Sequence, residues 1–259
     1  MIVAHTLNRL DRLDRWLLYK GAMAASGFEP SALTRHIAVN KEDYRDQGEL
    51  CEAGAVEFPE YFNFHKDSKT EYPGFGHLVC TWGTLRAWST IAEGDSFAIF
   101  TCDDYYLKAR KRKLEKLVST LENVNIIQLA HHARDDIFFY DTYGLNLSYK
   151  FGQYKISELS QEVYEGMGHS SSESHLLSPY GASCLLEYLT AYPKLNAEPA
   201  SQGMYQAFLN GDFKYVEGVY SVVHNDISEN GLVVMQNNRW IGHLIEYSEG
   251  AKSDLREWS

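Results

Sequence analysis

Short apolar runs alternate with amphipathic segments through the first 130 residues, and this alternation constrains the fold more than any other feature of the chain. The apolar runs have the length of buried strands and lie at residues 2–5, 35–39, 96–101 and 125–130. Apolar residues recur at helical spacing in the segments 10–26, 78–92 and 108–121. Strands that alternate with helices favour an α/β fold, in which a mostly parallel twisted sheet carries helices on both faces.

Local signals mark the ends of some of these elements. Gly27, followed by Pro30, predicts the end of the first helix. Ser178 and Pro179 predict the N-cap and first turn of a later helix that ends near Tyr192.

The remaining segments are less regular. A further helix is expected over residues 198–209 and a strand over 214–223. The polar stretch 41–73 is interpreted as an ordered surface excursion rather than a core element, and 131–177 as a long loop region.

Composition narrows the class of protein. A length of 259 residues suits one large domain, and no stretch approaches the ~18 uninterrupted apolar residues of a membrane helix. The net charge of −11 argues against a generic nucleic-acid binder, although residues 108–113 hold five basic residues in six. No pattern typical of a signal peptide opens the chain, and the four cysteines have no CxxC spacing, so we expect a cytoplasmic protein with reduced cysteines.

An acidic pair, Asp103 and Asp104, directly follows the apolar run 96–101. In open α/β sheets, ligands bind beyond the carboxyl ends of the strands. Adjacent carboxylates on a rigid element suit Mn²⁺ or Mg²⁺, which prefer oxygen ligands. The alternative is a simple turn or helix cap, where aspartate is also favoured.

Motifs for other kinds of site are missing from the sequence. It has no Walker A pattern and no GxSxG, and the Gly-rich start at Gly74 and Gly76 lacks the third glycine of a dinucleotide fingerprint. A bound nucleotide would therefore not lie on a P-loop, and we expect a metal to balance much of its phosphate charge.

The segment 76–88, the apolar run 96–101 and the acidic pair resemble the glycosyltransferases of the lipooligosaccharide-biosynthesis type. Those enzymes carry a Gly-x-x-Gly-Cys-x-x-Ser-His-x-x-x-Trp helix, an apolar strand and a Glu-Asp-Asp motif. Shorter likenesses follow in the same order at 7–12, 126–129, 177–182 and 215–224, so the resemblance covers about residues 2–226. Cys102 stands where the family has Glu, and Gly83-Thr84 stands in place of Ser-His.

The resemblance implies one GT-A-like domain over residues 1–226, with a C-terminal extension, 227–259, packed on it. It implies a metal-dependent glycosyltransferase (a hexosyltransferase) that moves a sugar from a nucleotide-sugar donor, a UDP-sugar by preference, to a hydroxyl acceptor. The expected acceptor is a surface glycan. A modified DNA base is the alternative, to which only the basic run 108–113 points. An inactive GT-A-like binding protein and a metal-dependent phosphohydrolase are the competing interpretations.

Site roles follow from the same resemblance. Asp103, Asp104 and His224 would hold Mn²⁺ or Mg²⁺, and Glu198 would act as the catalytic base. An ordinary capping His224, and a Glu198 that only complements a helix dipole, are the structural alternatives. The residues expected to contact the donor are Thr6, Asn8, Arg9, Arg12 and Cys102.

Overall fold

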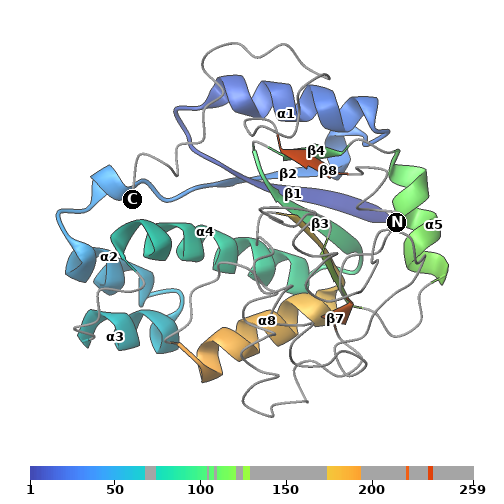
Figure 1. The fold of residues 1–259 in the computed structure, drawn as a ribbon. Coiled ribbons are helices and arrows are strands. Elements are labelled where there is room, and N and C mark those ends of the chain that lie inside the picture. Colours follow the sequence, from blue (N-terminus) through green and yellow to red (C-terminus); the bar gives the residue numbers. More distant parts are fainter. Residues whose placement is uncertain are drawn as a thin grey trace, which may run out of the picture.

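The computed structural model describes residues 1–67, 74–103, 105–107, 110–120, 125–128, 174–193, 220–221 and 233–235, and within them the chain has an α/β fold (Figure 1). Glu198, His224, Asp104, the expected helix 198–209 and most of the expected extension 227–259 lie outside these residues.

In the part of the chain that the structure describes, the main sheet has six strands in the order β2-β1-β3-β6-β5-β7. Their bounds are Ile2–Asn8 (β1), Leu33–Ile37 (β2), Phe97–Cys102 (β3), Ile126–Gln128 (β5), Ser174–Leu177 (β6) and Tyr220–Ser221 (β7). Strands β4 (Tyr105–Leu107) and β8 (Val233–Met235) pair with each other in a separate two-stranded sheet. The strands predicted from the first 130 residues are thus confirmed, within a few residues at each end.

Among the described residues the sheet is mixed but mostly parallel, as predicted: five of its six strands run in one direction and β6 runs in the other. Strands β2 and β3 both run parallel to β1, as the alternating pattern predicted. Strand β6 is antiparallel to both of its neighbours, β3 and β5. It arises from the end of the segment 131–177, so the interpretation of that whole segment as a loop was wrong at residues 174–177. A run as short as Ser-His-Leu-Leu carries too little periodicity to be recognised as a buried strand.

Helices cover both faces of the sheet (Figure 1). On one face lie α1 (Leu13–Ala25) and α5 (Lys111–Thr120), and on the other α4 (Phe75–Ala92) and α8 (Pro179–Ala191). Two short 3₁₀ turns, Pro30–Ala32 and Lys41–Asp43, flank β2. None of the described helices is both long and apolar enough to cross a membrane.

Each face of the sheet has its own apolar core. Ile2, Ala4 and Ile99 pack toward α1, where they contact Tyr19 and Met23. The α4 side buries a second set, which includes Ala98, Phe100, Trp82, Trp88, Leu185 and Tyr188. Successive side chains of a strand point to opposite faces of the sheet. The face on which a polar strand residue lies therefore follows from its apolar neighbours in the same strand.

The predicted helix ends are confirmed by their hydrogen bonds. At the end of α1, the amide of Phe28 donates to the carbonyl of Met23 and the amide of Gly27 to that of Ala24, at 3.0 and 2.9 Å. This is a Schellman motif, and it requires the left-handed backbone that Gly27 adopts (φ 93°). At the start of α8, the hydroxyl of Ser178 accepts from the amide of Gly181 at 3.0 Å.

The interpretation of residues 41–73 as a surface excursion outside the core was wrong. The segment contains α2 (Gln47–Gly54) and α3 (Pro59–Asp67), which pack together beside α4. Leu50 and Phe62 have no exposed surface. Helices this short show little apolar periodicity, and helices of about two turns depend on tertiary packing for their stability. Their apolar residues could therefore be assigned to the core only once their neighbours were known.

Candidate functional site

Two polar side chains meet where β1 and β3 end. The parallel register pairs Leu7 with Cys102, so the next residues, Asn8 and Asp103, lie side by side. The Asn8 amide nitrogen donates to Oδ2 of Asp103 at 2.5 Å, and both residues are buried. Asp103 thus lies at the carboxyl end of a central strand, as the sequence predicted, and it points to the α1 side of the sheet.

The second partner of Asp103 comes from α1. Nη1 of Arg15 lies 3.4 Å from Oδ1 of Asp103, and the two side chains are only 6% and 10% exposed. A buried ion pair is expensive to break, because removal of one partner leaves the other charge without compensation in a poorly solvated place. This contact therefore ties α1 to the end of β3.

Arg35 of β2 extends the cluster to a third parallel strand. Its Nε donates to Oδ1 of Asn8 at 2.7 Å, and its Nη2 donates to the carbonyl of Arg9 at 3.0 Å. The guanidinium also lies over the ring of Trp16, 5.8 Å from its centroid. The amide nitrogen of Asn8 donates in addition to the carbonyl of Arg12 at 3.0 Å. Asn8 and Arg35 together brace residues 9–12, which we call the β1–α1 loop.

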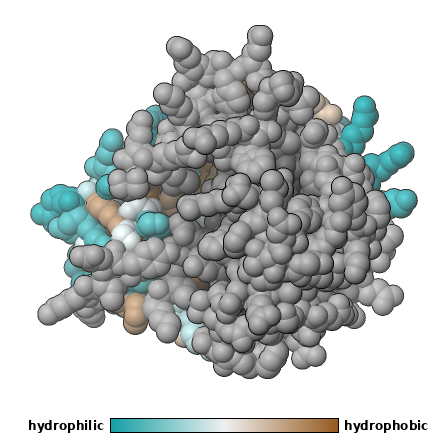
Figure 2. Space-filling view, viewed as in Figure 1, coloured by the Kyte–Doolittle hydropathy of each residue, from teal (hydrophilic) through white to brown (hydrophobic). Residues whose placement is uncertain are grey.

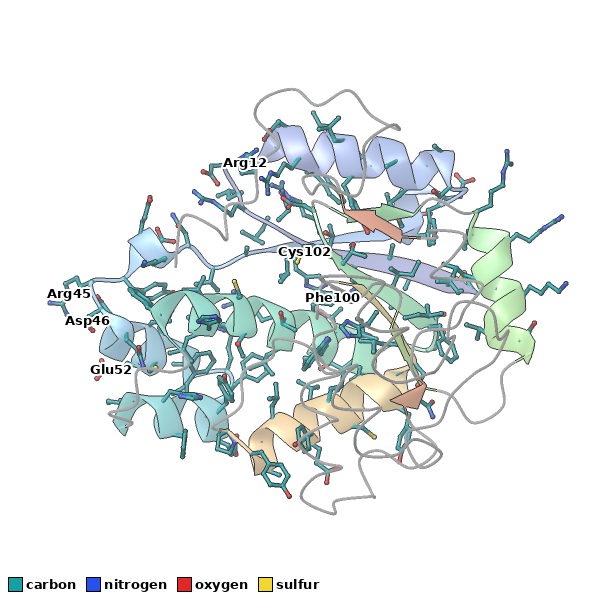
Figure 3. The ribbon with its side chains drawn as sticks, in the orientation of Figure 1. Arg12, Arg45, Asp46, Glu52, Phe100 and Cys102 are labelled. Carbon is teal, nitrogen blue, oxygen red and sulfur yellow. The ribbon has the colours of Figure 1, made fainter. Side chains whose placement is uncertain are left out.

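The β1–α1 loop carries two half-buried arginines. Arg9 makes two contacts with Asp11, at 3.0 and 2.9 Å, and Arg12 makes two with Asp14, both at 3.1 Å. The hydrogen bonds from these guanidinium groups lower the pKa of each aspartate. Figure 3 shows Arg12 at the start of α1 and Cys102 at the end of β3.

The other two expected donor contacts are placed differently. Thr6 has no exposed surface and lies within β1, where it pairs with Thr101. Cys102 is half-buried, and the alternation along β3 directs it to the α4 side, opposite Asp103. The structure therefore joins Asn8 to Asp103 directly and holds Arg9 and Arg12 near them through their backbone carbonyls, whereas Thr6 lies within the strand and Cys102 faces the opposite side of the sheet.

A metal centre cannot be assembled from the described residues alone. Among them, no group of three His, Cys, Asp or Glu residues could hold a metal ion. The one described member of the acidic pair, Asp103, has a guanidinium at Oδ1 and an amide at Oδ2. A divalent cation on Oδ1 would lie beside the positive charge of Arg15, so these residues do not fit a metal. Asp104, His224 and the expected base Glu198 are outside the described residues.

The described part of the basic run lies away from this cluster. Its Lys111 amide donates to the carbonyl of Ser26 at 2.7 Å, at the far end of α1 and near the amino ends of the strands (Figure 1). Lys111 pairs with Glu115, while Arg110 and Arg112 are exposed. The space-filling view shows hydrophilic side chains at this margin of the molecule (Figure 2).

Sequence reasoning missed Arg15 and Arg35. Two signals pointed to them: Arg9, Arg12 and Arg15 recur at a spacing of three through the start of a helix, and Arg35 is a charged residue at the start of an apolar strand. Neither pattern indicates which residue the arginine contacts, because Asp103 and Asn8 lie 88 and 27 positions away in the chain. No model of a known protein family matches the sequence, and no curated protein matches it either.

Proposed function

We propose that this chain is a GT-A-like glycosyltransferase that binds a nucleotide-sugar donor at the carboxyl ends of β2, β1 and β3. One observation carries the proposal: Asn8 and Asp103 meet at the ends of β1 and β3, and Arg35 reaches Asn8 from within the neighbouring parallel strand β2. The loop that follows β1 presents two arginines beside them. This edge is where open α/β sheets bind ligands. The order of motifs that resembles the lipooligosaccharide-type glycosyltransferases supports the same assignment.

The β1–α1 loop suits the diphosphate of such a donor. A guanidinium can hold a phosphate through two parallel hydrogen bonds, and Arg9 and Arg12 are each a fifth to a quarter exposed. Each guanidinium now donates to an exposed aspartate, Asp11 or Asp14. A bound phosphate would accept these hydrogen bonds in place of the aspartate. Positive charge at the diphosphate would stabilise the nucleotide as it leaves.

The remaining roles belong to residues outside the described part of the chain. The Mn²⁺ or Mg²⁺ ion that the resemblance implies would depend on Asp104 and His224, and it would supply Lewis-acid chemistry at the diphosphate. Glu198 is the proposed base for the acceptor hydroxyl. A surface glycan is the proposed acceptor.

The first test is binding. Purified protein is heated with each of several nucleotide sugars, with MnCl₂ and with EDTA, and the Tm is recorded. A donor that binds the native state raises the Tm. The double variant Arg9→Ala/Arg12→Ala is expected to bind that donor about 10- to 100-fold more weakly, through loss of charge-assisted hydrogen bonds. Arg45→Ala is the matched control, since Arg45 pairs with Glu49 at α2 and is 84% exposed (Figure 3).

The second test is turnover. Hydrolysis or transfer of the bound donor is measured with a panel of glycan acceptors. If no nucleotide sugar raises the Tm and none is turned over, with Mn²⁺ or without it, the proposal is wrong. Phosphate release from simple esters without an acceptor would instead support a phosphohydrolase.

A second candidate function is a GT-A-like binding protein without catalysis. The observation in its favour is the ion pair of Arg15 with Asp103, which occupies a carboxylate that the resemblance assigns to the metal. This candidate predicts a donor-dependent rise in Tm with no turnover under any metal.

A further inference from the structure

We propose that Asp103 is a positioning residue that fixes the β1–α1 loop, and that it is not a metal ligand. This inference rests on the proposed function in one respect: the ligand that the loop binds is taken to be a diphosphate. The positioning itself rests on the contacts among Arg15, Asp103, Asn8 and the loop backbone.

Asp103 determines which way the Asn8 amide faces. An asparagine side chain has two N–H donors and one carbonyl oxygen. In Asn8, the nitrogen donates to Asp103 and to the Arg12 carbonyl, and the oxygen accepts from Arg35. An ionised carboxylate only accepts, so it can face the nitrogen of Asn8 but not its oxygen. With the amide held in this orientation, the loop is anchored at Arg12.

A second anchor reaches the loop from Arg35. Its guanidinium donates to Oδ1 of Asn8 and to the carbonyl of Arg9. Both ends of the β1–α1 loop are therefore attached to the same asparagine, directly at Arg12 and through Arg35 at Arg9. If the side-chain amide of Asn8 flipped, its oxygen would face the Asp103 carboxylate and its nitrogen would face the Arg35 guanidinium. Both contacts would then be unfavourable.

Charge explains why Asp103 is better suited to this task than to a metal. Its carboxylate lies between the Arg15 guanidinium and the Asn8 amide, and its side chain is 10% exposed. A divalent cation would have to share the carboxylate with a guanidinium held nearby in a poorly solvated place, where like charges repel strongly. The pair Arg15–Asp103 instead neutralises both groups.

The test compares Asp103→Asn, Arg15→Met and the double variant Asp103→Asn/Arg15→Met. Each single variant removes one partner of a buried ion pair, so each is expected to lower the Tm by on the order of 10 °C. The double variant leaves neither charge behind and is expected to recover at least about half of that loss. It therefore folds even where a single variant does not.

The readout specific to positioning is amide hydrogen exchange of peptides that cover the β1–α1 loop. We expect exchange there to rise at least about tenfold in Asp103→Asn and in the double variant, as one charge-assisted anchor is lost. Glu57→Gln is the matched control, since it breaks an ion pair with Arg86 on α4 and is expected to leave the loop unchanged. Binding of Mn²⁺ alone, followed by electron paramagnetic resonance, is expected to be the same in the double variant as in the wild type.

Two outcomes would overturn the proposal: unchanged loop exchange in Asp103→Asn and the double variant, or loss of Mn²⁺ binding in the double variant. If the wild type binds no Mn²⁺, the loop exchange alone decides. Failure of the proposed function gives a different result, namely no binding of any nucleotide sugar by the wild type. The Tm and the amide exchange of the variants still test the positioning role in that case.

Discussion

His5 and His36 face one another across the neighbouring strands β1 and β2, with Nδ1 of His5 2.9 Å from Nε2 of His36. Their rings are stacked, with centroids 5.1 Å apart. Such a contact needs one nitrogen that carries a proton and one that does not, so it suits two neutral rings. Burial first, and the neighbouring His36 second, lower the pKa of His5 to about 4. Burial also lowers the pKa of His36.

The first prediction is a loss of stability in mild acid. The unfolded chain takes up a proton at His5 below about pH 6.5, whereas the folded chain resists until about pH 4. The free energy of unfolding should therefore be highest above pH 6.5 and should fall by about 2 kcal/mol between pH 7 and pH 5 on account of His5. Urea unfolding at several pH values measures this. In His5→Gln the decrease should be smaller, and an equal decrease in both proteins would contradict the assignment.

The second prediction concerns Arg86 of α4 and Glu57. Nε of Arg86 donates to Glu57 at 2.6 Å, Nη2 makes a second contact, and the guanidinium lies 4.7 Å from the ring centroid of Trp82. Arg86→Lys keeps the charge but loses the two-point contact and the stacking. Because both side chains are more than a third exposed, water screens the pair, and we expect a loss of only about 1 kcal/mol in urea unfolding.

Arg45→Lys is the control for this prediction. Arg45 is largely exposed and contacts Glu49 through Nε. Its replacement should change the free energy of unfolding by less than about 0.5 kcal/mol. Equal effects of the two substitutions would show that the two-point contact of Arg86 adds nothing.

The third prediction compares two helical glycines. A Cβ on Gly54 at the end of α2 would lie 2.7 Å from ring atoms of Phe62, which is fully buried. Gly54→Ala should therefore lower the free energy of unfolding by about 1–3 kcal/mol, since the ring must move within a packed core. Gly21→Ala meets nothing within 4 Å in the middle of α1 and should raise stability by up to about 1 kcal/mol. A stabilising Gly54→Ala would contradict this packing.

The fourth prediction concerns the start of α8. The Ser178 hydroxyl accepts from the Gly181 amide at 3.0 Å and donates to Oδ1 of Asn125 at 2.6 Å. Ser178→Ala removes both bonds from a buried position, at a cost of about 1–2 kcal/mol in thermal or urea unfolding. Ser183→Ala, on an exposed turn of the same helix, should cost less than about 0.5 kcal/mol. A cost at Ser183 equal to that at Ser178 would argue against a specific cap.

Local signals predicted much of the fold. Gly27 and Ser178 mark helix ends through backbone conformation and hydrogen bonds that involve only residues a few positions away. The apolar runs that became β1 and β3 could be recognised because a buried strand needs apolar side chains on both faces. Helices α2 and α3 could not be predicted in this way, since their few apolar residues, such as Phe62, show a pattern only against α4 and α8.

The candidate site, too, could be predicted from the sequence only in part. The sequence by itself determined that an acidic pair follows a central strand and that arginines follow the first strand. Only the tertiary structure decided that Asp103 is held by Asn8 and Arg15, which lie 95 and 88 positions away in the chain. The physical reason is the range of the forces: strand and helix formation depend on near neighbours, whereas the charge state and the freedom of a carboxylate depend on whichever groups the fold brings beside it.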